Sequence, residues 1–103
     1  MIRGSIFPID LGKPRGHEQG GRRFGVIMSQ ANSSTVVVVP TSTSAQPSRF
    51  RPVIDLGDGR ETRLLADQIR AIDVAYLTSD MLGYLDRDEM DALETAVRDY
   101  LDL

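Results

Sequence analysis

The sequence predicts a single α+β domain, residues 1–103, built on a small, curled antiparallel sheet with a C-terminal α-helix. Strand-like runs follow one another to about residue 84, and no helical pattern separates them, so no β–α–β unit fits. Apolar residues recur at helical spacing only in the last eighteen positions. A chain of 103 residues is long enough for one modest hydrophobic core and too short for two.

The first two predicted strands, residues 3–9 and 24–29, flank a long polar loop. Pro8 donates no ladder hydrogen bond, so we expect it at an edge or near a strand end. The segment 10–21 holds four glycines and a proline, which disfavour regular structure. A loop of this length in so small a domain is often functional.

The third predicted strand, residues 35–41, is expected at the centre of the sheet. Its four consecutive valines indicate burial on both faces. Pro40 is expected to end this strand. A cluster of hydroxyls then follows at its C-terminal edge, namely Thr41, Ser42, Thr43 and Ser44.

A hairpin and an irregular segment lead into the helix. The Asp-Gly pair at 58–59 lies between strand-like residues 50–56 and 61–66, which is a strong hairpin signal. Residues 67–73 are expected to continue in extended form. Residues 74–84 are expected to hold a short helical turn and a short strand.

Asp86 is predicted as the N-cap of the final helix, with Glu89 completing a capping box. The acidic residues of its first turns suit the helix dipole. An apolar stripe follows at helical spacing and should face the sheet: Met90, Leu93, Ala96, Val97, Tyr100 and Leu101.

The formal net charge of −3 is unevenly distributed. Residues 1–30 carry a net +3, whereas residues 86–103 carry a net −5. Such asymmetry can mark a binding site for an anionic ligand at the basic end. The alternative is a solvated acidic helix face beside a basic loop, and charge alone leaves both open.

Several kinds of site are excluded by composition. The absence of cysteine excludes disulfides, thiolate metal sites and cysteine nucleophiles, and the lone His17 excludes a metal site of several histidines within one chain. No P-loop motif is present. We expect no metal and no cofactor. The sequence shows neither a long apolar run nor a signal-peptide pattern, so we expect a cytoplasmic protein with no membrane segment.

The remaining polar features suit a phosphodiester, and RNA in particular. Guanidinium groups such as the Arg22–Arg23 pair bind phosphate bidentately, and hydroxyls and glycine-loop amides add neutral donors. RNA carries its own nucleophile in the 2′-hydroxyl. An enzyme that uses it needs a proton acceptor, a donor to the leaving oxygen and a cation beside the developing charge, without a metal.

Four motifs, in this order, resemble those of the MazF/PemK/Kid toxin family of type II toxin–antitoxin systems, and together they cover nearly the whole chain. They are Arg3-Gly4, residues 16–23 with 26–29, Val39-Pro40-Thr41, and residues 67–73. Residues 40–46 and 65–68 look closest to actinobacterial, mycobacterial-type members.

The resemblance implies an SH3-like or CcdB-like β-barrel sheet that works as a two-fold homodimer. It also implies a sequence-specific, metal-independent endoribonuclease toxin that cleaves single-stranded RNA. Attack by the 2′-hydroxyl would leave a 2′,3′-cyclic phosphate and a 5′-hydroxyl. A MazE-like antitoxin would neutralise the toxin by laying a disordered acidic tail across the RNA groove.

The resemblance assigns catalytic roles to specific residues. Arg23, expected directly before the second strand, would stabilise the phosphorane, and Thr41 would orient the scissile phosphate. His17 and Asp67 match residues that one branch of the family uses, so both are candidate catalytic residues. The alternatives are a loop histidine without a catalytic part and a carboxylate that braces Arg70.

The resemblance also implies a set of RNA contacts: Arg15, Glu18, Gln19, Gly20, Arg22, Ser42 and Arg70. For Glu18 the alternative is an ion pair that orders the loop, and for Arg22 it is a solvated cation. Phe24 stands where the family commonly has proline, and an aromatic ring there could stack on a base. Leu65 stands where the Kid-like branch has a second catalytic arginine, so the general base stays open.

Two other functions fit the predicted fold. One is a non-enzymatic, CcdB-like gyrase poison, but that activity rests on a tryptophan-containing tail, and this chain has no tryptophan and ends Leu101-Asp102-Leu103. The other is a binding module whose toxin activity has decayed. The presence of Arg23 and Thr41 weighs against it.

Overall fold

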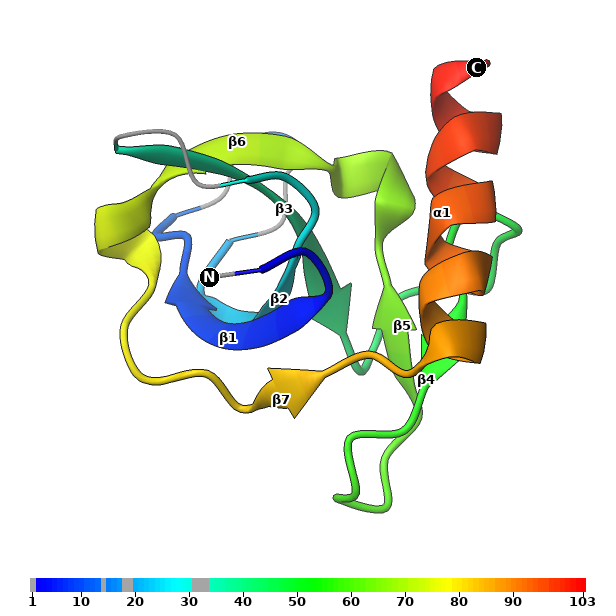
Figure 1. Ribbon diagram of the computed structural model, residues 1–103, viewed down its shortest axis with the longest axis horizontal. Helices are drawn as coiled ribbons and strands as arrows, with labels where there is room; N and C mark the ends of the chain where they lie inside the picture. Colours follow the sequence, from blue (N-terminus) through cyan, green and yellow to red (C-terminus); the bar gives the residue numbers. More distant parts are fainter. Residues whose placement is uncertain (1, 14, 18–19, 31–33) are drawn as a thin grey trace.

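A curled antiparallel sheet with one helix packed beside it forms the body of the protein (Figure 1). The computed structural model describes residues 2–13, 15–17, 20–30 and 34–103. Its elements are β1 (Ser5–Asp10), β2 (Arg22–Ile27), β3 (Thr35–Ser42), β4 (Val53–Ile54), β5 (Thr62–Leu64), η1 (Ala66–Gln68), β6 (Arg70–Asp73), η2 (Val74–Tyr76), β7 (Gly83–Tyr84) and α1 (Arg87–Leu101). The strand order is β4-β5-β3-β2-β1-β7, with β6 also paired to β3, and all pairs are antiparallel. The predicted fold class is therefore confirmed.

The valine strand β3 holds the sheet together, as predicted. It pairs with β2, β5 and β6, and Val36, Val38 and Val39 are buried. The prediction that Pro40 ends the strand is wrong, because β3 continues to Ser42. At this point β3 exchanges β6 for β5 as its partner, and the carbonyl of Pro40 accepts the N–H of Leu65.

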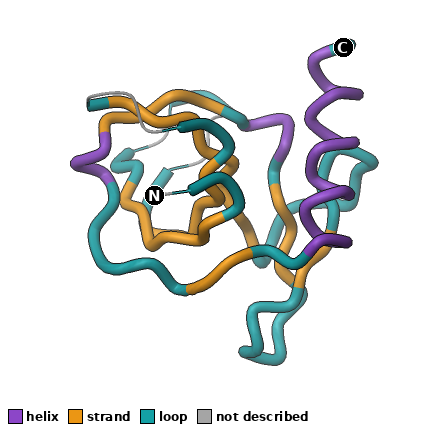
Figure 2. The backbone as a smooth tube through the Cα atoms, in the orientation of Figure 1, coloured by secondary structure: helices purple, strands orange, loops and turns teal. Residues whose placement is uncertain are grey.

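The second half of the sheet departs further from the predictions. The strands expected at 50–56 and 61–66 shorten to the two residues of β4 and the three of β5, joined by the predicted hairpin (Figure 2). The expected extended run 67–73 is interrupted by the 3₁₀ turn η1 at its start. Burial of Leu65 and Ala66 and the turn bonds to their carbonyls curl the chain before β6 begins. The helical turn and strand expected within 74–84 are confirmed as η2 and β7.

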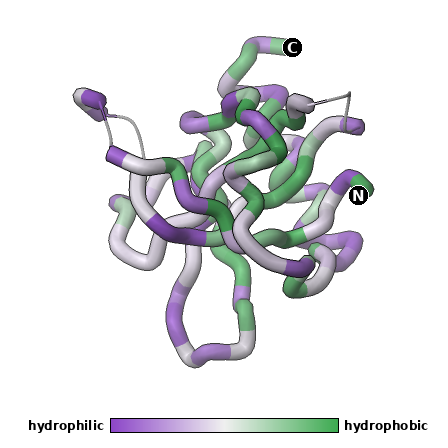
Figure 3. Tube along the Cα trace, turned by 90° about the vertical axis from the view of Figure 1, so that its left-hand side faces the viewer, coloured by the Kyte–Doolittle hydropathy of each residue, from purple (hydrophilic) through white to green (hydrophobic). Residues whose placement is uncertain are grey.

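Two hydrophobic clusters stabilise the curl. One lies between the sheet and α1 and includes Leu64, Leu93 and Ala96, while the other is formed by strand residues such as Ile9 and Ile27. Figure 3 shows hydrophilic residues at the tip of the projecting β4–β5 hairpin and apolar residues along the interior strands. Within the described residues, no helix combines the length and apolarity needed to cross a membrane.

The helix α1 is positioned from its N-terminal end. The predicted capping box is confirmed, since the carboxylate of Asp86 accepts the Glu89 N–H and the Glu89 carboxylate accepts the Asp86 N–H. The predicted stripe is buried only in part. Tyr100 and Leu101 are about half exposed, and the Tyr100 ring meets the Phe50 ring edge-on.

A close approach between β1 and β2 explains why residue 25 is a glycine. Gly25 lies within β2, and its φ is not positive. A Cβ built on Gly25 would lie 2.7 Å from Cδ1 of Ile9, which is only 1% exposed. We expect Gly25→Ala to lower the free energy of unfolding by about 1–3 kcal/mol through overpacking, as measured by urea denaturation. The control is Gly83→Ala in β7, where the added Cβ meets no described atom within 4 Å. Equal stability of the two variants would contradict this packing.

Candidate functional site

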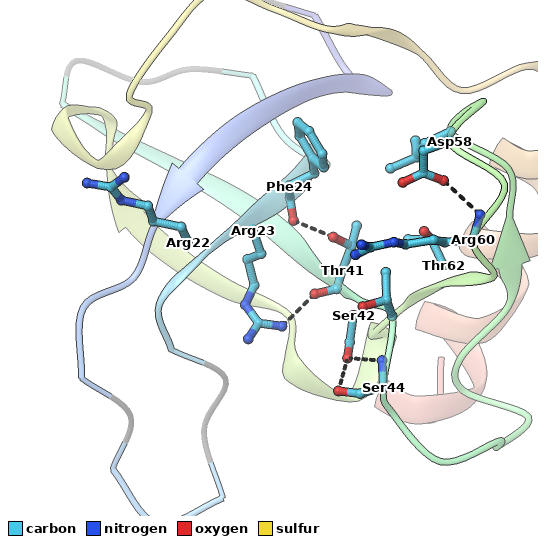
Figure 4. A pocket seen from close by; sticks show the side chains of 11 residues that line it. Arg22, Arg23, Phe24, Thr41, Ser42, Ser44, Asp58, Arg60 and Thr62 are labelled. Carbon is cyan, nitrogen blue, oxygen red and sulfur yellow. Dashed lines mark hydrogen bonds between the residues drawn. The ribbon is translucent and has the colours of Figure 1, made fainter.

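The C-terminal end of β3, the start of β2 and the β4–β5 hairpin enclose an open pocket of about 270 Å³ (Figure 4). Most of its walls are basic or hydroxylic, with apolar side chains at one side. The lining residues are Arg22, Arg23, Phe24, Thr41, Ser42, Thr43, Ser44, Leu56, Asp58, Arg60 and Thr62. The pocket thus unites the arginine pair and the hydroxyl cluster that the sequence singled out.

Arg23 is fixed in the pocket by backbone carbonyls. Its Nε and Nη2 donate to the carbonyl of Gly20 at 3.0 and 2.8 Å, and Nη1 donates to the carbonyl of Thr41 at 2.6 Å. Contrary to prediction, Arg23 lies inside β2 rather than before it. Partial burial lowers the pKa of its guanidinium, yet an arginine stays charged at neutral pH. A cation is therefore held in place, partly shielded from water, before any substrate binds.

Thr41 contributes its carbonyl to this arrangement, while its hydroxyl is used elsewhere. The side chain is 3% exposed, and Oγ1 donates to the carbonyl of Phe24 at 2.9 Å. This hydrogen bond joins β2 to β3 on the face of the sheet that Phe24 occupies. The expected catalytic hydroxyl thus has a structural partner.

Ser42 supplies the hydroxyl on the same face as Arg23. The β2–β3 register pairs Gly25 with Pro40, and continued by two residues it sets Arg23 opposite Ser42. Figure 4 shows both side chains directed to one side and Phe24 to the other. The Oγ of Ser42 accepts the N–H of Ser44 at 3.1 Å and lies 3.4 Å from the Ser44 Oγ. The alternation of side chains along a strand is the sequence signal that could have shown that Ser42, and not Thr41, faces the same side as Arg23.

Asp67 is paired with an arginine that the sequence did not single out. Nε and Nη2 of Arg51 donate to its two carboxylate oxygens at 3.0 and 2.8 Å, and both side chains are about one-fifth exposed. The hydrogen bond to Asp67 raises the pKa of Arg51. Asp67 therefore braces Arg51, a partner that the predictions did not include. Arg70 lies on β6 opposite Val38. No local pattern connects positions 51 and 67, so the sequence could not show the pair.

The glycine-rich loop reaches η1 as well as the pocket. Nε2 of Gln68 donates to the carbonyl of His17 at 3.3 Å, and the His17 side chain is exposed. Arg15 is also exposed. The Arg22 side chain is 91% exposed, and its Nε lies 3.7 Å from Oδ2 of Asp10. Such a surface ion pair contributes little to stability. The predicted contacts Glu18 and Gln19 lie outside the described residues.

No arrangement suited to a metal ion is found within the described residues. Among them, no group of three or more histidine, cysteine, aspartate or glutamate side chains could hold one. The pocket instead offers a fixed guanidinium, hydroxyl groups and an exposed surface arginine. These groups can bind and polarise a phosphate group.

Comparison with known proteins places the chain among toxins. The family model "PemK-like, MazF-like toxin of type II toxin-antitoxin system" matches residues 2–101. The chain is 50% identical over 106 residues to the candidate toxin Rv3098A of Mycobacterium tuberculosis, covering 100% of this chain and 99% of that protein. It is 31% identical to endoribonuclease EndoA of Bacillus subtilis, over 93% of this chain and 90% of the relative.

Solved structures share the fold at lower identity. MazF of Deinococcus radiodurans superimposes with a TM-score of 0.84 at 22% identity, covering 98% of this chain and 96% of that one. An endoribonuclease from a mycobacterial species, solved with its cognate antitoxin, superimposes with a TM-score of 0.78 at 24% identity, covering 100% of this chain and 96% of that one. With a family match over nearly its whole length and a full-length relative at 50% identity, this chain belongs to the PemK-like, MazF-like toxins of type II toxin–antitoxin systems.

Proposed function

We propose that this toxin is a sequence-specific, metal-independent endoribonuclease that cleaves single-stranded RNA through attack by the 2′-hydroxyl. The observation that carries the proposal is the Arg23 guanidinium, held by two carbonyls opposite the Ser42 hydroxyl in an open pocket. The 31% identity to an endoribonuclease supports the same reaction class.

The proposed reaction needs charge stabilisation more than a strong nucleophile. The 2′-oxygen bonds to the adjacent phosphorus as its proton passes to a base, and the bond from phosphorus to the 5′-oxygen breaks. The leaving oxygen takes up a proton, so the products are a 2′,3′-cyclic phosphate and a 5′-hydroxyl. Arg23 stabilises the added negative charge, and its carbonyl partners fix it beforehand, so little reorganisation is needed.

The other roles follow from the contacts of each side chain. Ser42 donates a hydrogen bond to a non-bridging phosphate oxygen, the task expected of Thr41. Asp67 engages Arg51 through both carboxylate oxygens, which suits a positioning role. His17 lies exposed on the glycine-rich loop, where a substrate can reach it, so we assign it as the proton acceptor.

The proposed assembly is a two-fold homodimer in the cytoplasm, regulated by a MazE-like antitoxin. Solved relatives include MazE–MazF of Deinococcus radiodurans and a mycobacterial endoribonuclease with its cognate antitoxin. In a dimer the basic pocket is doubled, and an acidic antitoxin segment would neutralise both copies. The acidic helix α1 carries most of the net negative charge and packs against η1.

Arg23→Ala should lower the rate of RNA cleavage by about two to three orders of magnitude, the usual effect of losing one preorganised charge stabiliser. Arg23→Lys keeps the charge and loses the planar fork, so it should restore only part of the rate. Cleavage of a long RNA is followed by mapping 5′ ends in the presence of EDTA. Full activity of the alanine variant, or loss of wild-type activity in EDTA, would sink the proposal.

Ser42→Ala and Thr41→Val separate the two neighbouring hydroxyls. Ser42→Ala should lower the cleavage rate at least about tenfold with little change in Tm. Thr41→Val keeps the carbonyl that binds Arg23 but leaves the Phe24 carbonyl without its donor, so it should cost about 1–3 kcal/mol of stability. Thermal unfolding and single-turnover cleavage are measured on both variants. A rate loss confined to Thr41→Val would contradict the assignment.

A further inference from the structure

A buried hydroxyl on the hairpin side of the pocket has no partner. We define the hairpin side by Phe24, Leu56, Asp58, Arg60 and Thr62, which line the pocket across from the Arg23 guanidinium. Thr62, at the start of β5, is 1% exposed, and its Oγ1 finds no hydrogen-bond partner among the described residues. Buried hydroxyls are nearly always satisfied, so an orphan one requires an explanation.

The sheet holds this hydroxyl in place. Thr62 pairs with Ile54 across the hairpin, and Leu64, two residues on and on the same face, is fully buried. The paired strand β5 therefore fixes the backbone that carries the orphan hydroxyl. An unpaired buried hydroxyl lowers the stability of the protein when no RNA is bound. A valine of the same shape would avoid this loss, because it has no hydroxyl to leave unpaired.

The surroundings of Thr62 resemble those of a base-binding pocket. Phe24 and Leu56 are partly buried and form apolar walls. The side chains of Asp58 and Arg60 are exposed and line the pocket from the hairpin. The Asp58 carboxylate accepts the backbone N–H of Arg60 at 3.0 Å and orders the turn. Proteins recognise single-stranded RNA by splaying bases out, stacking them on aromatic rings and hydrogen-bonding their edges.

The position of Phe24 links this pocket to the proposed cleavage chemistry. Phe24 follows Arg23 in β2, and successive side chains of a strand point to opposite faces. A phosphate held by Arg23 and Ser42 on one face thus leaves the hairpin side on the other face for a neighbouring nucleotide. Figure 4 shows Phe24, Asp58 and Arg60 grouped on that side.

We propose that the hairpin side of the pocket binds one unstacked RNA base next to the scissile phosphate, and that Thr62 is a specificity-determining residue. The ring of Phe24 stacks on this base, and the Thr62 hydroxyl hydrogen-bonds its edge. The base thereby supplies the hydrogen-bond partner that Thr62 lacks in the free protein. A base that cannot form this hydrogen bond leaves the Thr62 hydroxyl unpaired and binds more weakly. This inference rests on the proposed function, since it assigns the substrate of the same site.

The test compares Thr62→Val with Thr95→Val, which removes an exposed hydroxyl from α1. Three quantities are measured for both variants and the wild type. The first is Tm, and the second is the cleavage preference over an RNA library with randomised positions. The third is the affinity for an uncleavable analogue in which 2′-deoxyribose replaces ribose and uracil is used in place of thymine. The sequence of this analogue is varied so that each of the four bases occupies each position in turn. The third measurement does not depend on catalysis.

For Thr62→Val we expect a Tm a few degrees higher, because an unpaired buried hydroxyl is removed. Discrimination among the four bases should fall about tenfold at one position only, because RNA with the preferred base there is cleaved about tenfold more slowly at subsaturating concentration and RNA with the other three bases is cleaved as by the wild type. Thr95→Val should change none of the three quantities.

Three results would overturn the inference: an unchanged base preference, a uniform loss over all sequences, or weakened antitoxin binding with base preference intact. If the wild type cleaves no RNA, the proposed function fails. The subsite still stands if the deoxy analogue shows a base preference that Thr62→Val removes.

Discussion

The site depends on the hydrogen bonds that hold the Arg23 guanidinium in place. This guanidinium binds the carbonyl of Gly20 in the glycine-rich loop and that of Thr41 at the end of β3, so one side chain joins a loop to the sheet. An arginine that satisfies backbone carbonyls with some of its five N–H groups retains others for a ligand. Partial burial weakens competition from water and strengthens the attraction to a phosphate. In the proposed function, substrate binding and the stability of the site therefore depend on the same group.

The exchange of strand partners at the end of β3 shapes the rest of the pocket. There β3 leaves β6 and takes up β5, which brings the β4–β5 hairpin across from the start of β2. The alternation of side chains along β2 and β3 then divides the pocket into two sides. Arg23 and Ser42 face one side, and Phe24 faces the other. The proposed chemistry and the proposed base recognition thus arise from the same two strands at adjacent positions.

The sequence predicted what local patterns encode. The valine run, the capping box of Asp86 and the Asp-Gly hairpin signal were sufficient for the sheet, the helix and their order. The family motifs pointed to Arg23 and to the hydroxyl cluster, which the structure brings together in one pocket. Features that depend on distant partners were missed. They include the η1 turn set by burial, the Arg51–Asp67 pair and the hydrogen bond that withdraws the Thr41 hydroxyl.

The central claim is that the substrate supplies the nucleophile while this chain supplies fixed charge and hydrogen-bond donors. The chemical identity of the newly formed RNA ends tests this most directly. Mass spectrometry of a short RNA cleaved by the wild-type protein in EDTA should show a 2′,3′-cyclic phosphate on one fragment and a 5′-hydroxyl on the other. A 3′-hydroxyl paired with a 5′-phosphate would mean that water attacks the phosphorus, and it would contradict the account.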